Sequence, residues 1–153
     1  GTNGVFQTCN AEDPLVYHTD LQQWAGMVYL TPNAPFECGT SMYAHKETRA
    51  RHISEPGYER AFDGGFYDST KFELVDTVGN VFNRLVIFNG KCIHAASQYF
   101  GKDVADARLF HMFFFDWFLT MTKTCKICLH SMVGNEEKVI LRMLESCYKY
   151  VDY

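Results

Sequence analysis

The stretch GNVFNRLVIFNGKCIHAASQYFG, residues 79–101, holds the clearest strand signal in the chain. Within it, the apolar and β-branched run Arg84–Phe88 lies between the turn residues Gly79-Asn80 and Asn89-Gly90. Short apolar runs bounded by such residues are typical of buried strands. Three more runs share this pattern, and we expect them to form strands too: Trp24–Thr31, Arg108–Leu119 and, more weakly, Lys71–Val78.

Two other segments complete the predicted organisation. The polar stretch Ala44–Ser69 is expected to be a long excursion between strands, of the kind that often shapes a substrate site. A helix is expected near the C-terminus, where Asn135 can cap it and apolar residues recur at helical spacing as far as Val151. These elements predict an α+β domain that is mainly β, a sandwich or barrel with the helix packed outside.

Length and charge bound the function. The chain has 153 residues, which favours one domain, and its 16% aromatic content excludes a disordered or coiled-coil protein. The net charge of −4 leaves no basic surplus for phosphates, so a nucleic-acid partner is not expected. No apolar run is long enough for a transmembrane helix, so a membrane partner is not expected either.

The chain has six cysteines. We expect most of them to be free, buried thiols in a reducing compartment, because nothing at the N-terminus resembles a signal peptide; this favours a cytoplasmic protein. Cys125, Cys128 and His130 could begin a zinc site in an interaction module, or the two cysteines could form a redox pair. Since only Cys147 is near enough to be a fourth ligand, packed free thiols are the favoured interpretation.

Metal-ligating residues form the most informative pattern. In a strand, His18 and Asp20 would project from the same face, and an imidazole with a carboxylate supplies two of the three ligands of a facial iron(II) triad. Alone, the pair could equally be hydrogen-bonded at the surface. A further histidine, His94, follows the strand at Arg84–Phe88, and Arg108 opens another strand fourteen residues later.

This order resembles the iron(II)- and 2-oxoglutarate-dependent oxygenases, in particular their prolyl-4-hydroxylase-like branch. The family pattern is His-x-Asp, a long gap, a distal histidine and then a basic residue, and Tyr17–Phe115 follows it over about two-thirds of the chain. Short sequence segments agree as well. MVYLTP with GTSMY resembles the family's second barrel strand and the turn after it. Residues 79–101 resemble the strand pair that delivers the distal histidine.

The resemblance implies a double-stranded β-helix, a jelly-roll or cupin-like barrel with its core at about residues 15–118 and a C-terminal supporting helical tail at 120–153. It implies that His18, Asp20 and His94 hold Fe(II), while Arg108 and Tyr29 anchor 2-oxoglutarate. Such an enzyme uses O2 to hydroxylate a C–H bond of a small-molecule or peptidyl substrate, releasing succinate and CO2. The alternative is a cupin-like metal- or ligand-binding protein without turnover. A homodimer is compatible with either reading.

Three further residues are candidates for the pocket, and three further histidines are not expected to take part. Thr31, Asn83 and Arg84 are weaker candidates, because Asn83 fits a turn and Arg84 an exposed edge equally well. His111 alternates to the face opposite Arg108, so it is expected to be packed or directed outward. His45 and His52 lie in the polar excursion and are expected to be solvated.

Overall fold

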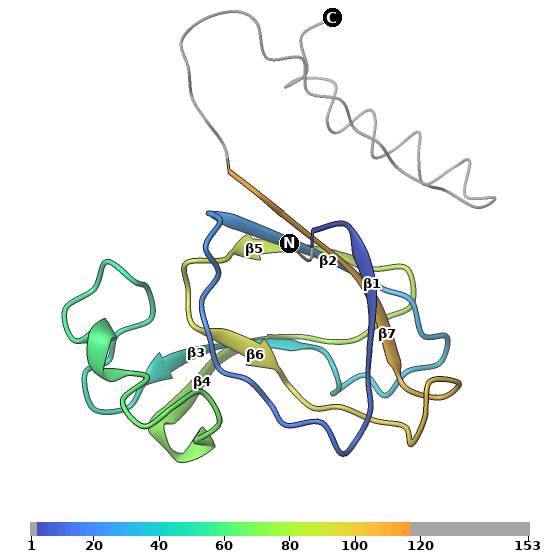
Figure 1. Ribbon diagram of the computed structural model, residues 1–153, viewed down its shortest axis with the longest axis horizontal. Coiled ribbons are helices and arrows are strands. Elements are labelled where there is room, and N and C mark those ends of the chain that lie inside the picture. Colours follow the sequence, from blue (N-terminus) through green and yellow to red (C-terminus); the bar gives the residue numbers. More distant parts are fainter. Residues whose placement is uncertain (1–2, 117–153) are drawn as a thin grey trace, which may run out of the picture. The chain divides into compact units, whose positions relative to one another are not determined.

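Two antiparallel sheets form the described part of the chain, which in the computed structural model is residues 3–116 (Figure 1). The larger sheet has the order β1-β7-β2-β5 and the smaller has the order β4-β3-β6. The strands are β1 (Val5–Cys9), β2 (Trp24–Tyr29), β3 (Thr40–His45), β4 (Phe72–Val78), β5 (Leu85–Asn89), β6 (His94–Ala96) and β7 (Arg108–Phe115). The chain divides into the units Gly1–Trp117 and Phe118–Tyr153, and the described residues all belong to the first.

The larger sheet is built around β2 and β7, whose side chains alternate between buried and less buried positions. Met27 and Tyr29 of β2 pack with Val86 of β5 and Phe110 of β7 in one buried cluster. Since side chains two residues apart share a face, these residues define the inner face of the sheet. On the other face, the ring of Phe113 lies against the backbone of β2.

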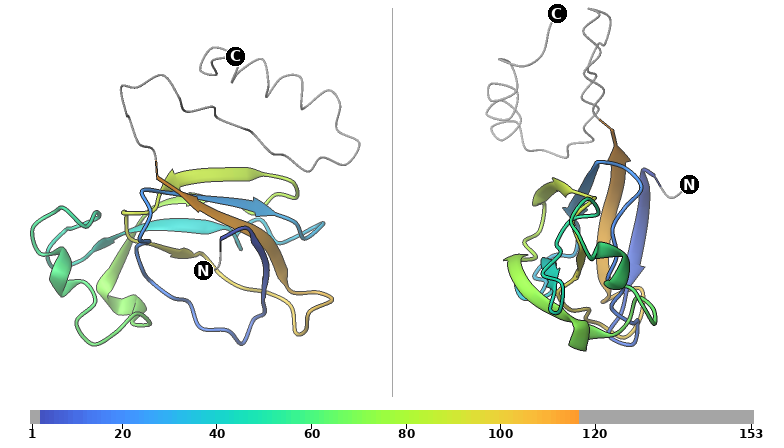
Figure 2. Two further views of the ribbon diagram at one scale, coloured as in Figure 1. Left: turned by 45° about the horizontal axis from the view of Figure 1, so that its top comes forward. Right: turned by 90° about the vertical axis from the view of Figure 1, so that its left-hand side faces the viewer.

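The smaller sheet lies opposite this inner face, so that the two sheets form two layers (Figure 2). Its two faces are both covered. On the inner face, the Thr40 hydroxyl accepts a hydrogen bond of 2.8 Å from the Tyr29 hydroxyl, which joins the two sheets. On the outer face, Ile93 and Ala95 pack with Tyr17 and Phe72, away from the other sheet. His94 lies between Ile93 and Ala95 in sequence and therefore points to the inner side.

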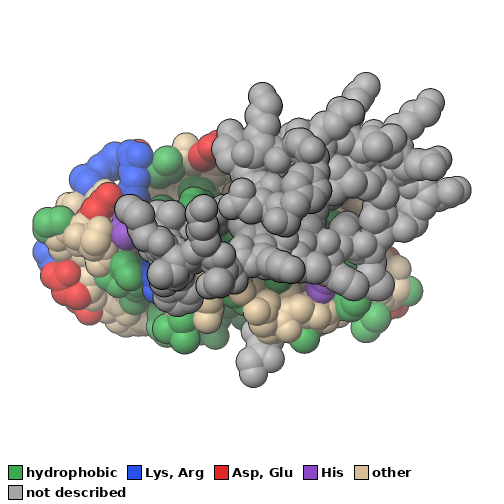
Figure 3. Space-filling view, turned by 90° about the horizontal axis from the view of Figure 1, so that it is seen from above, with side chains coloured by type: hydrophobic (Ala, Val, Ile, Leu, Met, Phe, Trp, Pro, Cys, Tyr) green, Lys and Arg blue, Asp and Glu red, His purple; other side chains and the backbone are tan. Residues whose placement is uncertain are grey.

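The excursion after β3 is ordered and covers the outer face of the smaller sheet. It contains the short 3-10 helices η1 (Tyr58–Arg60) and η2 (Ser69–Lys71), and Ala61 and Phe62 pack into the outer cluster. Basic and acidic side chains both gather at this end of the molecule (Figure 3). The excursion is therefore a polar, exposed loop, and its apolar residues Ala61 and Phe62 pack against the smaller sheet.

The predicted strands agree with the structure, apart from their ends. The runs expected at Trp24–Thr31, Lys71–Val78 and Arg84–Phe88 correspond to β2, β4 and β5. The run expected at Arg108–Leu119 ends as a strand at Phe115, and its last residues lie outside the described part of the chain. The predicted C-terminal helix also lies outside it. The mainly β class and the two antiparallel sheets are confirmed.

Hydrophobic patterns alone missed three strands, of which β6 was implied only by the resemblance of residues 79–101 to a strand pair. β6 has only three residues, β3 mixes polar and apolar residues, and β1 is a short run at the N-terminal end. All three are defined by their pairing partners: β1 by β7, and β3 and β6 by each other.

Within residues 3–116, no helix is long and apolar enough to span a bilayer.

Candidate metal centre

A pair of backbone hydrogen bonds brings His18 and His94 together. The His18 amide donates to the His94 carbonyl at 3.0 Å, and the His94 amide donates back at 2.9 Å. Residues that exchange both bonds in an antiparallel pair carry their side chains on the same face. The two imidazole centroids are accordingly 4.3 Å apart. The expectation that His18 and Asp20 lie in a regular strand is wrong, because His18 forms only an isolated bridge.

Each imidazole is held in one orientation by its own backbone. Nδ1 of His18 donates to the Val16 carbonyl at 2.9 Å, and Nδ1 of His94 donates to the Cys92 carbonyl at 2.8 Å. A carbonyl can only accept, so Nδ1 carries the proton in both rings, and a neutral ring then keeps its lone pair on Nε2. This is how proteins orient histidines that bind metals.

The carboxylate of Asp20 lies between the two Nε2 atoms. Its Oδ1 is 3.6 Å from Nε2 of His18, and its Oδ2 is 3.4 Å from Nε2 of His94. Oδ2 is buried without a hydrogen-bond partner. Burial raises the pKa of Asp20 and, with His18 nearby, lowers the pKa of His94 to about 3. An anion faces lone pairs here, and a cation among them would satisfy all three groups.

The donor set indicates which cations fit. The three ligand atoms lie within 4.8 Å of one another, with two nitrogens and one oxygen donor. Two imidazoles and one carboxylate suit Fe(II), and they also accept Zn(II) or Mn(II). Among residues 3–116, this is the one group of three or more such side chains close enough to share an ion.

Gly90 makes room for the carboxylate. The Asp20 amide donates to the Gly90 carbonyl at 2.7 Å, which holds the two segments together. A Cβ at position 90 would lie 2.9 Å from Oδ2 of Asp20 and 3.0 Å from the Gln22 carbonyl oxygen. The Asn-Gly turn thus supplies a glycine where any side chain would displace the carboxylate.

We therefore expect Gly90→Ala to weaken metal binding by about tenfold to a hundredfold, as is typical when the support of a ligand is disturbed. Calorimetric titration with Mn(II) measures the affinity. Gly65→Ala is the control: its Cβ meets nothing within 4 Å, but φ is +113°, so the variant loses stability without touching the site. Equal affinities for the Gly90 variant and the wild type would contradict the prediction.

A second charged group, Arg108, is buried between the two sheets with an exposed fraction of 1%. One guanidinium nitrogen donates to the Gly39 carbonyl at 3.1 Å and to the Thr40 hydroxyl at 3.3 Å, while Nε has no partner. No carboxylate of the described residues forms an ion pair with Arg108. A buried guanidinium left without an anion is costly, so Arg108 is a candidate for binding an anion.

Aromatic rings surround Arg108 on several sides. Its Cζ is 4.7 Å from the ring centroid of Phe110, 5.4 Å from that of Tyr29 and 5.6 Å from that of Tyr99. Burial raises the pKa of Tyr99 to about 12, so this hydroxyl supplies no negative charge. The rings hold the guanidinium in place without neutralising it.

Phe88 links the two charged sites. It packs against the inner cluster that contains Tyr29 and Phe110, and its ring centroid is 4.7 Å from that of His94. Arg108 and the three-residue cluster therefore lie on either side of Phe88, with the His18 side chain 37% exposed. The five predicted site residues fall into these two groups: His18, Asp20 and His94 on one side, and Tyr29 with Arg108 on the other.

The weaker candidates lie elsewhere. Asn83 occupies a turn with φ of +62°, and Arg84 donates to the Gly79 carbonyl at 2.8 Å. Thr31 bonds the backbone of residues 107 and 109. His111 stacks on Phe6, on the face away from Arg108, as expected.

One of the histidine expectations is wrong. His45 is buried, with an exposed fraction of 4%, because the start of the excursion turns back over it: Thr48 bonds its Nδ1 at 2.8 Å, and its amide donates to the Ala50 carbonyl at 2.8 Å. His52 is half-buried and bonds Ser54. Cys9, Cys38 and Cys92 are free thiols, as expected, but only Cys38 is buried, and the other two are partly exposed. Cys125, Cys128 and His130 lie outside the described residues.

Sequence reasoning missed two residues that shape the interior. Thr40 contacts both Tyr29 and Arg108, and Gly90 accommodates Asp20. The only signals for them were the Gly39-Thr40 pair where β3 begins and the Asn89-Gly90 turn where β5 ends. Neither signal says what the residue contacts, because both contacts are made between segments distant in sequence.

Comparison with known protein families gives a match for this chain. A model of DUF6445, a family of unknown function, matches residues 12–115. The chain belongs to this family. The match spans the excursion and every predicted site residue from His18 to Arg108, so the site lies within the segment that defines the family. No curated protein and no solved structure matches the chain.

Proposed function

We propose that this DUF6445 protein is an Fe(II)- and 2-oxoglutarate-dependent dioxygenase that resembles the prolyl-4-hydroxylase-like branch. The observation that carries the proposal is the unneutralised guanidinium of Arg108, buried across Phe88 from the cluster of His18, Asp20 and His94. A metal-binding protein alone needs the cluster but has no use for a buried cation. A dicarboxylate that also binds the metal would need both.

The strand order supports the finer fold that the proposal requires. The His18 segment bridges to β6 and so takes the place of a fourth strand beside the smaller sheet. Counted with it, eight segments alternate between the sheets except at β3 and β4, which pair within the smaller sheet. The first and last segments, β1 and β7, pair with each other. Such an order supports a jelly roll, or double-stranded β-helix, as the finer fold.

Each residue then has a role. His18, Asp20 and His94 would hold Fe(II), and their Nδ1 bonds keep both Nε2 atoms directed at it. Arg108 would bind the far carboxylate of 2-oxoglutarate, because its planar group can grip both oxygens. The hydroxyls of Tyr29 and Thr40 lie beside it and would complete that contact. Bound iron would supply O2 activation, so that a C–H bond becomes C–OH while 2-oxoglutarate becomes succinate and CO2.

The proposal is tested first without oxygen. Anaerobic addition of Fe(II) and 2-oxoglutarate to the full chain is expected to give a weak visible charge-transfer band, which His94→Ala abolishes. His111→Ala is the matched control, since it removes an imidazole on the opposite face. A wild-type protein that gives no band under these conditions would refute the proposal.

Admitting oxygen separates turnover from binding. A dioxygenase converts 2-oxoglutarate to succinate, slowly even without its own substrate, in an iron-dependent reaction that can be followed by mass spectrometry. A band without any succinate would instead indicate the cupin-like binding protein. Zinc retained by the His94→Ala variant would point to a metal site other than this cluster.

A further inference from the structure

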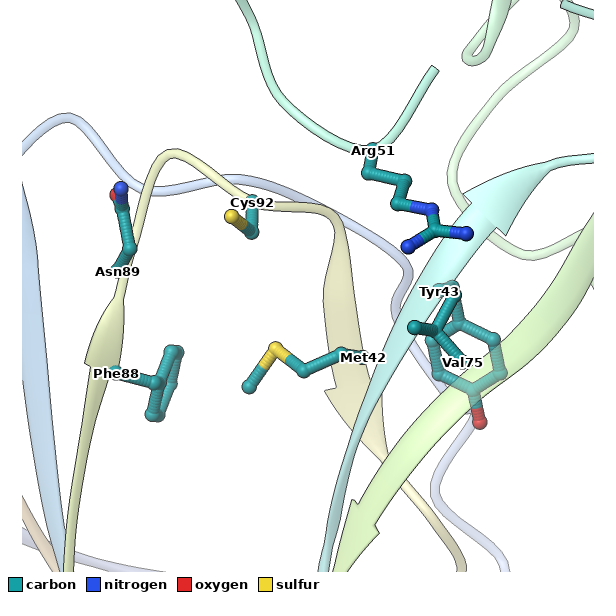
Figure 4. A pocket seen from close by; sticks show the side chains of 7 residues that line it. All are labelled: Met42, Tyr43, Arg51, Val75, Phe88, Asn89 and Cys92. Carbon is teal, nitrogen blue, oxygen red and sulfur yellow. The ribbon is translucent and has the colours of Figure 1, made fainter. Parts of the chain in front are cut away.

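A cavity of about 250 Å³ lies beside the candidate metal centre, and none of the roles proposed so far involves it. The lining is almost wholly apolar: Met42, Val75 and Phe88 supply its main wall, and Arg51, Asn89 and Cys92 lie around it (Figure 4). In the figure, Met42 of β3 points toward Phe88 of β5, and Arg51 from the excursion lies near Tyr43. The cavity thus has an apolar body, and Arg51 lies at its edge.

Contacts connect this cavity to the cluster. Phe88 packs its ring against that of His94, and Met42 is the partner of His94 in the β3–β6 register. Cys92 accepts the hydrogen bond that orients His94, and Asn89 immediately precedes Gly90. One wall of the cavity is therefore also the surround of the proposed metal ligands.

Arg51 is well placed as an anion contact. Its backbone is fixed, since its amide donates to the Glu55 carboxylate at 2.6 Å and its carbonyl accepts from Ile93 at 2.8 Å. Its guanidinium makes no ion pair with any described residue, whereas Arg49 and Arg60 of the same excursion pair with glutamates. The backbone thus holds this cation beside the cavity while leaving its charged group available.

Cys92 does not compete as the functional group of the cavity. Burial, with Glu55 nearby, raises the pKa of its thiol, so the reactive thiolate is disfavoured. The Cys92 thiol therefore only forms part of the cavity wall. The size of the cavity also limits its ligand, because pockets for larger ligands measure about 300–1,000 Å³.

We propose that this cavity is the substrate pocket and binds a small organic acid, with its carboxylate on Arg51 and its aliphatic or aromatic body against Met42, Val75 and Phe88. The assignment as substrate rests on the proposed dioxygenase function. A planar guanidinium recognises a carboxylate through two parallel hydrogen bonds, and the apolar wall next to His94 would keep the C–H groups of the acid near the metal.

The test uses two acids, 3-phenylpropanoate and 4-methylpentanoate, and their primary amides as neutral partners of the same shape. Ligand-observed NMR on the metal-free full chain measures their binding. We expect the acids to bind better than the amides, and Arg51→Gln to weaken the acids by about tenfold to a hundredfold, the usual effect of losing hydrogen bonds to a charged group. Arg60→Gln is the control and should leave binding unchanged.

A second measurement places the ligand relative to the metal. Mn(II) bound at the cluster should broaden the proton signals of an acid held in this pocket, in the wild type and in Arg60→Gln alike. Loss of acid binding in Arg108→Met but not in Arg51→Gln would overturn the proposal, as would equal binding of acids and amides. Arg51-dependent binding without broadening by bound Mn(II) would refute the substrate assignment.

Failure of the proposed function remains distinguishable. If Mn(II) does not bind, the metal centre is refuted and the substrate role falls with it. The Arg51 dependence, measured on metal-free protein, still decides whether the cavity binds acids.

Discussion

Arg108→Met is expected to abolish 2-oxoglutarate binding while leaving the free protein at least as stable as the wild type. Methionine has a similar length, and the surrounding rings of Tyr29, Tyr99 and Phe110 can pack against it. The wild-type guanidinium is 1% exposed and has an Nε without a partner. Replacing such a buried, unpaired charge with an apolar group removes a desolvation cost.

The loss of affinity follows from the same geometry. Two hydrogen bonds to a charged carboxylate are together worth about 3 kcal/mol, or roughly a hundredfold in affinity. Thermal unfolding of the Mn(II)-loaded protein at increasing 2-oxoglutarate concentrations measures both effects at once. Wild type should gain about 2.7 kcal/mol at a ligand concentration of a hundred times Kd, and Arg108→Met should gain almost nothing.

Arg84→Met is the matched control for this variant. Arg84 donates to a backbone carbonyl in a turn and lies outside the interior, so its loss should leave the 2-oxoglutarate response intact. A variant at position 108 that is stable and still responds like the wild type would show that 2-oxoglutarate is anchored elsewhere. A variant that is strongly destabilised would contradict the view that Arg108 is unneutralised in the free protein.

Asp20→Asn is expected to separate metal binding from stability in the same way. Asparagine keeps the shape of the side chain but removes the anion that a divalent cation requires, so metal affinity should fall at least about a hundredfold. The free protein should become more stable at neutral pH. Burial raises the pKa of Asp20, which means that its ionised form is the costly one in the fold, and Oδ2 has no hydrogen-bond donor.

Calorimetric titration with Mn(II) and urea unfolding of the metal-free protein measure the two effects. Asp76→Asn provides the control, because Asp76 is an exposed carboxylate on β4 and should change neither quantity. Unchanged metal affinity in Asp20→Asn would remove Asp20 from the ligand set. A large loss of stability without metal would show that the carboxylate is satisfied by a group of the free protein.

The sequence alone determined the strands whose signal is local. β2, β4 and β5 carry enough apolar or β-branched residues, bounded by turns, to be predicted from their own composition. It also determined which residue types could form the site, because the order of His18, Asp20, His94 and Arg108 is a property of the chain. The roles proposed for these residues stay predictions until a metal and a ligand are measured.

Only the tertiary structure decided how those residues meet. His18 lies outside any regular strand, so its position depends on the two backbone bonds to His94, a residue 76 positions away. The absence of an anion beside Arg108 among the described residues, the space that Gly90 leaves for Asp20, and the cavity beside Arg51 all arise where distant segments pack. Local patterns cannot encode such contacts, because burial and charge balance depend on every segment that closes around a residue.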